Sequence, residues 1–232
     1  MSLTPVLISS PFLGPAVWAP VERELREDFG VPAMTVALNG SGAADPVAIS
    51  AALRERLPQR DDLLLVPHSN AGLYVPSLLT AVPARGVVFV DAILPPPAGR
   101  LPVAPQRLRD LLSARADEAG LLPPWTEWWP EAVVAELFPN EATRELVASE
   151  QRRLPLAYLD AQVEAPAGWD RIPAAYLAFG DTYATEREDA RSRGWPVRTM
   201  DGQHLHMLRE PAAVAAAIMA LAARATGADP EA

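Results

Sequence analysis

Short apolar runs, each followed by an amphipathic segment, constrain the fold of this chain more than any other feature. Four such runs lie in the first half: "PVLIS" (5–9), "PAMTVAL" (32–38), "LLLVP" (63–67) and "RGVVFVDA" (85–92). Between them lie segments such as "VWAPVERELREDFG" (17–30), in which apolar residues recur every fourth position and charges fill the other face. Strands that are apolar on both sides need cover on both sides, so the pattern predicts a parallel sheet between helices.

The alternation pauses in the middle of the chain and then returns. A proline-rich stretch (93–105), which we interpret as a linker, and an irregular stretch (163–173) enclose a block (106–160) with helical patterns and no strand signal. After the block, strand patterns occur at 174–181 and 196–201. The remaining helices are predicted at 46–57, 70–82, 184–194 and 210–225.

A helical block between two halves of one sheet predicts an inserted cap. The predicted fold class is therefore α/β, with a mostly parallel sheet of about six strands, helices on both faces and a helical cap. The predicted parts are a first half of the core (1–97), the cap (98–169) and a second half of the core (170–232).

Composition excludes several kinds of function. The 232 residues suffice for one sizeable core, and the net charge of −9 without a basic stripe argues against a nucleic-acid partner. The absence of cysteine excludes thiolate chemistry, and all 20 basic residues are arginine, which excludes a lysine Schiff base. There is no bilayer-spanning apolar run and no basic leader at the start. We expect a cytoplasmic protein without a membrane partner, cofactor or metal.

Ser69 lies where a buried strand should turn sharply into a helix, in "LLLVPHSNAGLY" (63–74). A nucleophilic serine needs such a turn, and its usual pattern, G-x-S-x-G, keeps small residues two before and two after it. Those places hold Pro67 and Ala71, so the match is partial. Ser69 could instead cap the following helix, and the motif alone leaves both interpretations open.

Candidate partners for Ser69 follow later strands. Asp181 comes just past one predicted strand, and His204 and His206 come past the next. An acyl-transfer enzyme needs a nucleophile, a histidine base and a carboxylate that orients the histidine. The ends of parallel strands share one sheet edge, so these side chains can meet there. Asp91, which ends the fourth strand, is a rival carboxylate.

The chain resembles the α/β-hydrolase superfamily over nearly its whole length. The resemblance rests on the order Ser, Asp, His and on the pieces "VLISSPFLGPAVW", "LLLVPHSNAG", "LAFGDTY" and "MDGQHLHMLREPAAVAAAI". More narrowly, the chain looks like compact actinobacterial α/β-hydrolase-like proteins of natural-product biosynthesis. The resemblance implies Ser69 as nucleophile, His204 as base and Asp181 as acid, with Asp91 as the alternative. His206 is a less favoured base, and a His204-x-His206 metal site lacks a third ligand nearby.

The same resemblance implies an oxyanion hole and a pocket. The loop "SSPFLGP" (9–15) stands where the family usually has His-Gly-x-x-Gly, with Ser10-Pro11 in place of His-Gly. The backbone N–H groups of Phe12 and Asn70 then become the expected donors. Aromatic cap residues favour an apolar or aromatic ligand. The predicted pocket residues are Leu13, His68, Trp125, Trp128, Trp129 and Phe138.

Three functions follow in order of preference. The first is a serine hydrolase or acyl transferase for a small apolar or aromatic ester, thioester or lactone, with a role in secondary metabolism. The second is a non-hydrolytic enzyme of the same fold that performs cyclisation, carbon–carbon bond formation or cofactor-free chemistry on a polyketide-like intermediate. The third is a non-catalytic small-molecule binder. The alanine-rich last helix leaves a homodimer open.

Overall fold

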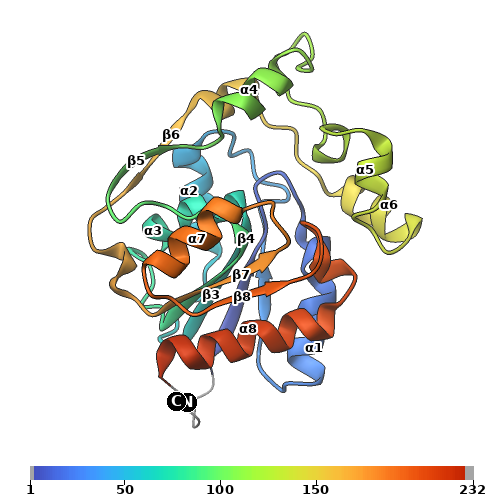
Figure 1. Ribbon diagram of the computed structural model, residues 1–232. Helices are drawn as coiled ribbons and strands as arrows, with labels where there is room; N and C mark the ends of the chain where they lie inside the picture. The colour runs from blue at the N-terminus through green and yellow to red at the C-terminus, as the bar shows by residue number, and fades with distance from the viewer. Residues whose placement is uncertain (1–2, 228–232) are drawn as a thin grey trace.

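A six-stranded parallel sheet forms the centre of the computed structural model, which describes residues 3–227 (Figure 1). The strands stand in the order β2-β1-β3-β4-β7-β8, and each neighbouring pair is parallel. Their bounds are β1 Thr4–Ile8, β2 Met34–Val36, β3 Leu63–Ser69, β4 Gly86–Ala92, β7 Ala174–Phe179 and β8 Val197–Met200. The predicted α/β fold and its six-strand sheet are confirmed.

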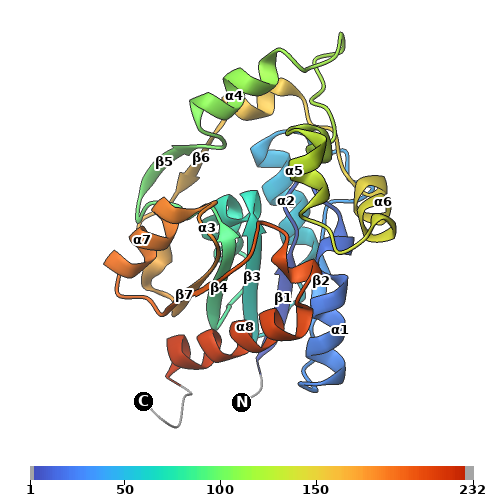
Figure 2. The same ribbon diagram turned by 45° about the vertical axis from the view of Figure 1, so that its right-hand side comes forward.

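Helices cover both faces of the sheet. α1 (Ala19–Glu27) and α8 (Pro211–Thr226) pack against each other on one face, as Figure 2 shows. α2 (Pro46–Arg56), α3 (Val75–Leu78) and α7 (Ala184–Ser192) lie on the other. Short 3₁₀ helices complete this core at Pro15–Val17, Asn70–Tyr74, Trp169–Arg171 and His206–Leu208. Within residues 3–227, no helix has both the length and the apolar character needed to span a membrane.

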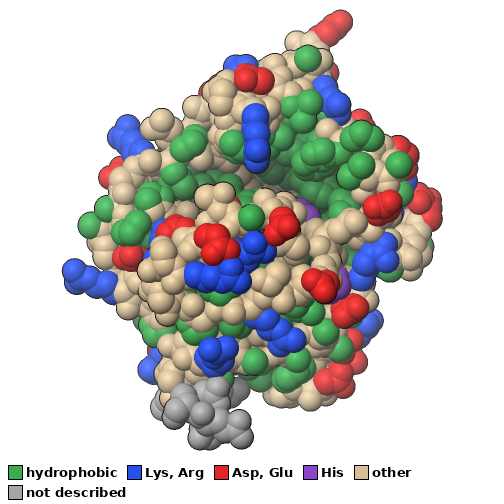
Figure 3. All heavy atoms as spheres, viewed as in Figure 1, with side chains coloured by type: hydrophobic (Ala, Val, Ile, Leu, Met, Phe, Trp, Pro, Cys, Tyr) green, Lys and Arg blue, Asp and Glu red, His purple; other side chains and the backbone are tan. Residues whose placement is uncertain are grey.

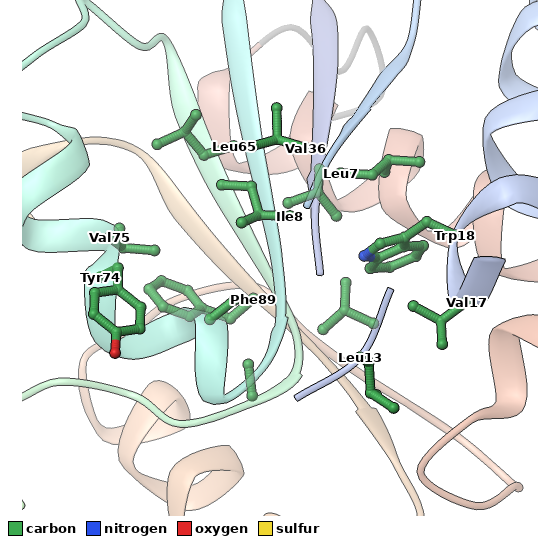
Figure 4. Close-up of a cluster of buried hydrophobic side chains, with 14 of the residues drawn as sticks. Leu7, Ile8, Leu13, Val17, Trp18, Val36, Leu65, Tyr74, Val75 and Phe89 are labelled. Carbon is green, nitrogen blue, oxygen red and sulfur yellow. The ribbon is translucent and has the colours of Figure 1, made fainter. Parts of the chain in front are cut away.

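The core explains why the central strands read as continuous apolar runs. All residues of β1, β3 and β4 are buried on both faces of the sheet. Figure 4 shows Leu7, Ile8 and Leu65 among the packed side chains, with Trp18 beside them. The segment predicted as one helix at 70–82 is a 3₁₀ helix (Asn70–Tyr74) followed by the short α3 (Val75–Leu78). Pro76 lacks the N–H that would bond to the preceding turn, so the α-helical part starts beside it.

The insertion between β4 and β7 lies above the carboxyl ends of the strands (Figure 1). Its helices are α4 Gln106–Ser113, α5 Glu131–Ala135 and α6 Glu141–Ser149, with 3₁₀ turns at Trp125–Glu127 and Leu156–Asp160. It also contains an antiparallel ribbon of β5 (Gly99–Pro102) and β6 (Gln162–Ala165). The prediction of a strandless linker at 93–105 and an irregular stretch at 163–173 is wrong for these strands. Each has four residues and is largely exposed, too short for an alternating pattern.

Candidate active site

Ser69 sits on a strained turn between β3 and the 3₁₀ helix Asn70–Tyr74. Its φ of 57° and ψ of −129° are rare for a residue with a side chain and cost on the order of 1–3 kcal/mol. In the described part of the chain, the Ser69 side chain does not cap the helix that follows. The turn also needs Gly72, because a Cβ there would lie 2.0 Å from the carbonyl oxygen of Ile93. The strained backbone therefore directs the Ser69 hydroxyl out of the strand, and this hydroxyl does not cap the helix.

Ser69, His204 and Asp91 form one chain of hydrogen bonds. His204 Nε2 lies 3.1 Å from Ser69 Oγ, and His204 Nδ1 lies 2.6 Å from Asp91 Oδ2. Asp91 Oδ1 accepts a second bond from the N–H of Phe179 at 3.0 Å. Ser69 is 6% exposed, His204 is 8% exposed and Asp91 is 0% exposed. Ser69 and His204 thus keep some exposed surface, whereas the carboxylate that orients the imidazole is sealed from water.

Asp181 does not occupy the place preferred for it. Its side chain is 84% exposed and pairs with Arg187 at 3.0 Å, and the carboxylate beside His204 is that of Asp91. A φ of 41° at Asp91 changes the backbone direction at the end of β4, and the Phe179 N–H holds the carboxylate beside His204. One sequence signal favoured Asp91: it is the charged residue within an otherwise apolar strand, and a charge in such a place needs a partner.

Tyr183 is a site residue that the sequence analysis missed. Its hydroxyl lies 3.3 Å from Ser69 Oγ, and its ring centroid lies 5.6 Å from that of His204. Burial raises the pKa of the Tyr183 hydroxyl above its usual value, so the group stays protonated and can donate. No motif marks this tyrosine, which directly precedes α7.

The other two histidines lie outside the hydrogen-bonded chain. His68 is fully buried beneath His204, with ring centroids 4.5 Å apart, and its Nε2–H donates to the His204 carbonyl at 3.0 Å. Burial, followed by the charge of His204, holds the pKa of His68 well below its usual value. The predicted contact of His68 with a pocket ligand stays a prediction. His206 packs on Phe179 and faces Glu210 at 3.9 Å, so it is not the imidazole that meets Ser69.

The predicted oxyanion donors come from the serine turn and from the loop after β1. Asn70 directly follows Ser69 and starts the 3₁₀ helix, where N–H groups lack partners within their own helix. The N–H of Phe12, in the loop after β1, has no acceptor among residues 3–227. Two such groups are what a developing oxyanion requires.

Aromatic side chains of the cap gather above the imidazole. Ring centroids of Trp125 and His204 lie 5.8 Å apart, and those of Phe12 and Trp128 lie 4.7 Å apart. Trp129 contacts both other tryptophans, at 4.9 and 5.6 Å. Figure 3 shows a hollow between cap and core that is lined by hydrophobic side chains and has a histidine at its edge.

Two further residues of the predicted pocket, Leu13 and Phe138, are buried. The Phe138 carbonyl accepts a bond from Arg209 Nη2 at 2.8 Å, which ties this part of the cap to the core. Their contact with a ligand stays a prediction.

Comparisons with solved structures fit this geometry. An extracellular α/β-hydrolase from a Paenibacillus species is 18% identical, with a TM-score of 0.70 over 96% of this chain and 98% of that chain. The chain has an α/β-hydrolase fold. Tomato methylketone synthase I is 15% identical, with a TM-score of 0.72 over 97% and 99% of the two chains. A methylesterase from Arabidopsis is 15% identical, with a TM-score of 0.66 over 94% and 98%. No protein-family model and no curated protein sequence matches the chain.

Proposed function

We propose that this α/β-hydrolase-fold protein is a serine-dependent hydrolase or acyl transferase. The observation that carries the proposal is the unbroken chain Ser69–His204–Asp91, with 3.1 Å and 2.6 Å between the bonded atoms. A serine on a strained turn, bonded to an imidazole whose other nitrogen meets a buried carboxylate, is the arrangement that activates a hydroxyl for attack on a carbonyl.

The chemistry follows from the positions of the atoms. Ser69 Oγ attacks the carbonyl carbon while its proton passes to His204 Nε2, and Asp91 stabilises the imidazolium through Nδ1–H. The carbonyl π electrons move to oxygen, and the N–H groups of Phe12 and Asn70 donate to this oxyanion. When the intermediate collapses, the bond to the leaving group breaks and His204 returns the proton to that group. Water, or an acceptor alcohol or thiol, then releases the acyl group by the same steps in reverse.

The walls of the hollow support an apolar or aromatic substrate. Trp125, Trp128, Trp129 and Phe12 form continuous aromatic contacts near His204. Such surfaces bind apolar groups through area burial and ring stacking. Small esters, thioesters or lactones with an apolar or aromatic part are therefore the substrate class that we propose. A role in secondary metabolism stays a prediction.

Hydrolysis of p-nitrophenyl acetate, butyrate and benzoate tests the proposal. We expect Ser69-dependent release of p-nitrophenol, and Ser69→Ala should lower kcat on the order of 10⁶-fold, as removal of a triad serine does. His206→Asn is the matched control and should keep kcat within about twofold, because His206 lies outside the hydrogen-bonded chain. Retained turnover in Ser69→Ala would refute the serine mechanism. Conversion of a polyketide-like compound that needs His204 and not Ser69 would favour the non-hydrolytic alternative.

A further inference from the structure

The side chain of Asn70 is held by the cap at both ends of its amide. Asn70 Nδ2 donates to the carbonyl oxygen of Val103 at 2.9 Å, and Asn70 Oδ1 accepts from the hydroxyl of Tyr158. Asn70, Val103 and Tyr158 are all buried. The residue that follows the nucleophile is therefore fixed by two cap residues, one just after β5 and one in the 3₁₀ turn before β6.

The proton positions in this network can be assigned. Because Asn70 Nδ2 faces a carbonyl, Oδ1 faces Tyr158, which must donate its single proton there. The Tyr158 oxygen then accepts from the Tyr74 hydroxyl, 2.8 Å away. Burial raises the pKa of both tyrosines, so both hydroxyls stay protonated. The bonds run in one direction, from Tyr74 to Tyr158 to Asn70.

The same part of the cap holds the other predicted oxyanion donor. The N–H of Arg152 donates to the carbonyl oxygen of Phe12 at 3.3 Å. The Arg152 guanidinium donates to the carbonyl oxygens of Ser41, at 3.1 Å, and Ala43. Glu150 accepts from the N–H of Ala16 at 2.7 Å. A single cap segment, residues 150–158, therefore contacts both the loop after β1 and the residue after the nucleophile.

We propose that Tyr158 is a positioning residue that aligns the Asn70 N–H with the oxyanion, so that the oxyanion hole is complete only when the cap is seated. This inference rests on the proposed function. The physical reason is that a preorganised donor stabilises the transition state only when its direction is fixed, and a shift of a fraction of an ångström is costly. The loop after β1 carries Ser10-Pro11 in place of His-Gly, and the cap contacts supply rigidity from outside it.

Tyr158→Phe tests the proposal with Tyr74→Phe as the matched control. Each variant removes one hydroxyl from the network, but only Tyr158→Phe removes the bond to Asn70. We expect kcat for p-nitrophenyl butyrate to fall about 10–100-fold in Tyr158→Phe, with KM changed less than about twofold, since loss of a whole oxyanion donor costs about 10²–10³-fold. In Tyr74→Phe, kcat should change less than about threefold.

A second measurement separates positioning from a merely structural role. A trifluoromethyl ketone becomes a tetrahedral oxyanion on the serine, so its Ki should rise in Tyr158→Phe by the same factor by which kcat falls. Should Tyr158→Phe fail to fold, Asn70→Ala tests the anchoring of this side chain by the cap, because it removes the bond from Tyr158 together with the bond to the Val103 carbonyl. In a double-mutant cycle, Asn70→Ala and Tyr158→Phe together should be no worse than Asn70→Ala alone.

The outcomes distinguish the inference from the function on which it rests. If wild-type protein shows no Ser69-dependent turnover, the proposed function fails and the inference fails with it. If wild-type turnover depends on Ser69 but Tyr158→Phe and Tyr74→Phe lower kcat equally, or the loss appears only in KM, the positioning role alone is overturned.

Discussion

Replacing Asp91 by asparagine should prevent His204 from acting as a base, while a side chain of nearly the same shape stays at position 91. The oxygen of the introduced amide can still accept from the Phe179 N–H, as the Asp91 carboxylate does at 3.0 Å, which directs the amide NH₂ toward His204 Nδ1. Two donors cannot face each other, so the imidazole proton moves to Nε2, the nitrogen that faces Ser69 Oγ at 3.1 Å. The base then has no lone pair for the serine proton. We expect kcat to fall about 10⁴-fold, equivalent to about 5.4 kcal/mol of transition-state stabilisation.

The assay is p-nitrophenyl butyrate hydrolysis by Asp91→Asn and Asp181→Asn, each checked by thermal unfolding. Asp181 is 84% exposed, and its surface ion pair with Arg187 contributes at most about 1 kcal/mol to stability. Asp181→Asn should therefore keep kcat within about twofold. A large loss in Asp181→Asn together with near-normal turnover in Asp91→Asn would refute the assignment of the acid.

Three further perturbations probe the turn, the missed tyrosine and the buried histidine. Gly72→Ala places a Cβ 2.0 Å from the Ile93 carbonyl and should lower the free energy of unfolding by about 1–3 kcal/mol in urea titrations; unchanged stability would contradict the close approach. Tyr183→Phe should lower kcat about tenfold, the equivalent of one hydrogen bond to Ser69, and an unchanged kcat would exclude that use of the hydroxyl. The pKa of His68 is depressed in the folded state, so the unfolded chain takes up this proton first. Its contribution to stability is complete above about pH 6.5 and is lost as the pH falls, by up to about 1.4 kcal/mol per pH unit, and the His68→Gln variant should lack this part of the slope.

The sheet could be predicted because its central strands β1, β3, β4 and β7 are buried on both faces, which leaves continuous apolar runs in the sequence. The turn at Ser69 and the imidazole of His204 followed from the ends of those strands, since parallel strands bring their carboxyl ends to one edge. Asp91 and Asp181 both lie at strand ends, and the order Ser, Asp, His outweighed the one signal for Asp91, its charge within an otherwise apolar strand. A backbone φ of 41° and one N–H from β7 decide the matter, and neither is visible in the sequence.

The cap was the least predictable part. Its ribbon consists of two four-residue strands that pair from opposite ends of the insertion, and pairing at that range leaves no local pattern. The contacts of Tyr158 and Tyr183 with the site depend on how the cap and the turn before α7 fold over the sheet. The sequence carried a signal for Asn70, because an amide side chain in a buried turn needs hydrogen-bond partners. The identity of those partners required the three-dimensional structure.

Labelling with a fluorophosphonate probe, followed by peptide mass spectrometry, tests whether Ser69 is a nucleophile activated by His204. The probe reacts with serines activated by a neighbouring base. We expect a single adduct on Ser69 in wild-type protein, and no adduct at that position in His204→Ala. Folded wild-type protein that takes no label, or an adduct on Ser69 that persists unchanged in His204→Ala, would contradict the proposed serine mechanism.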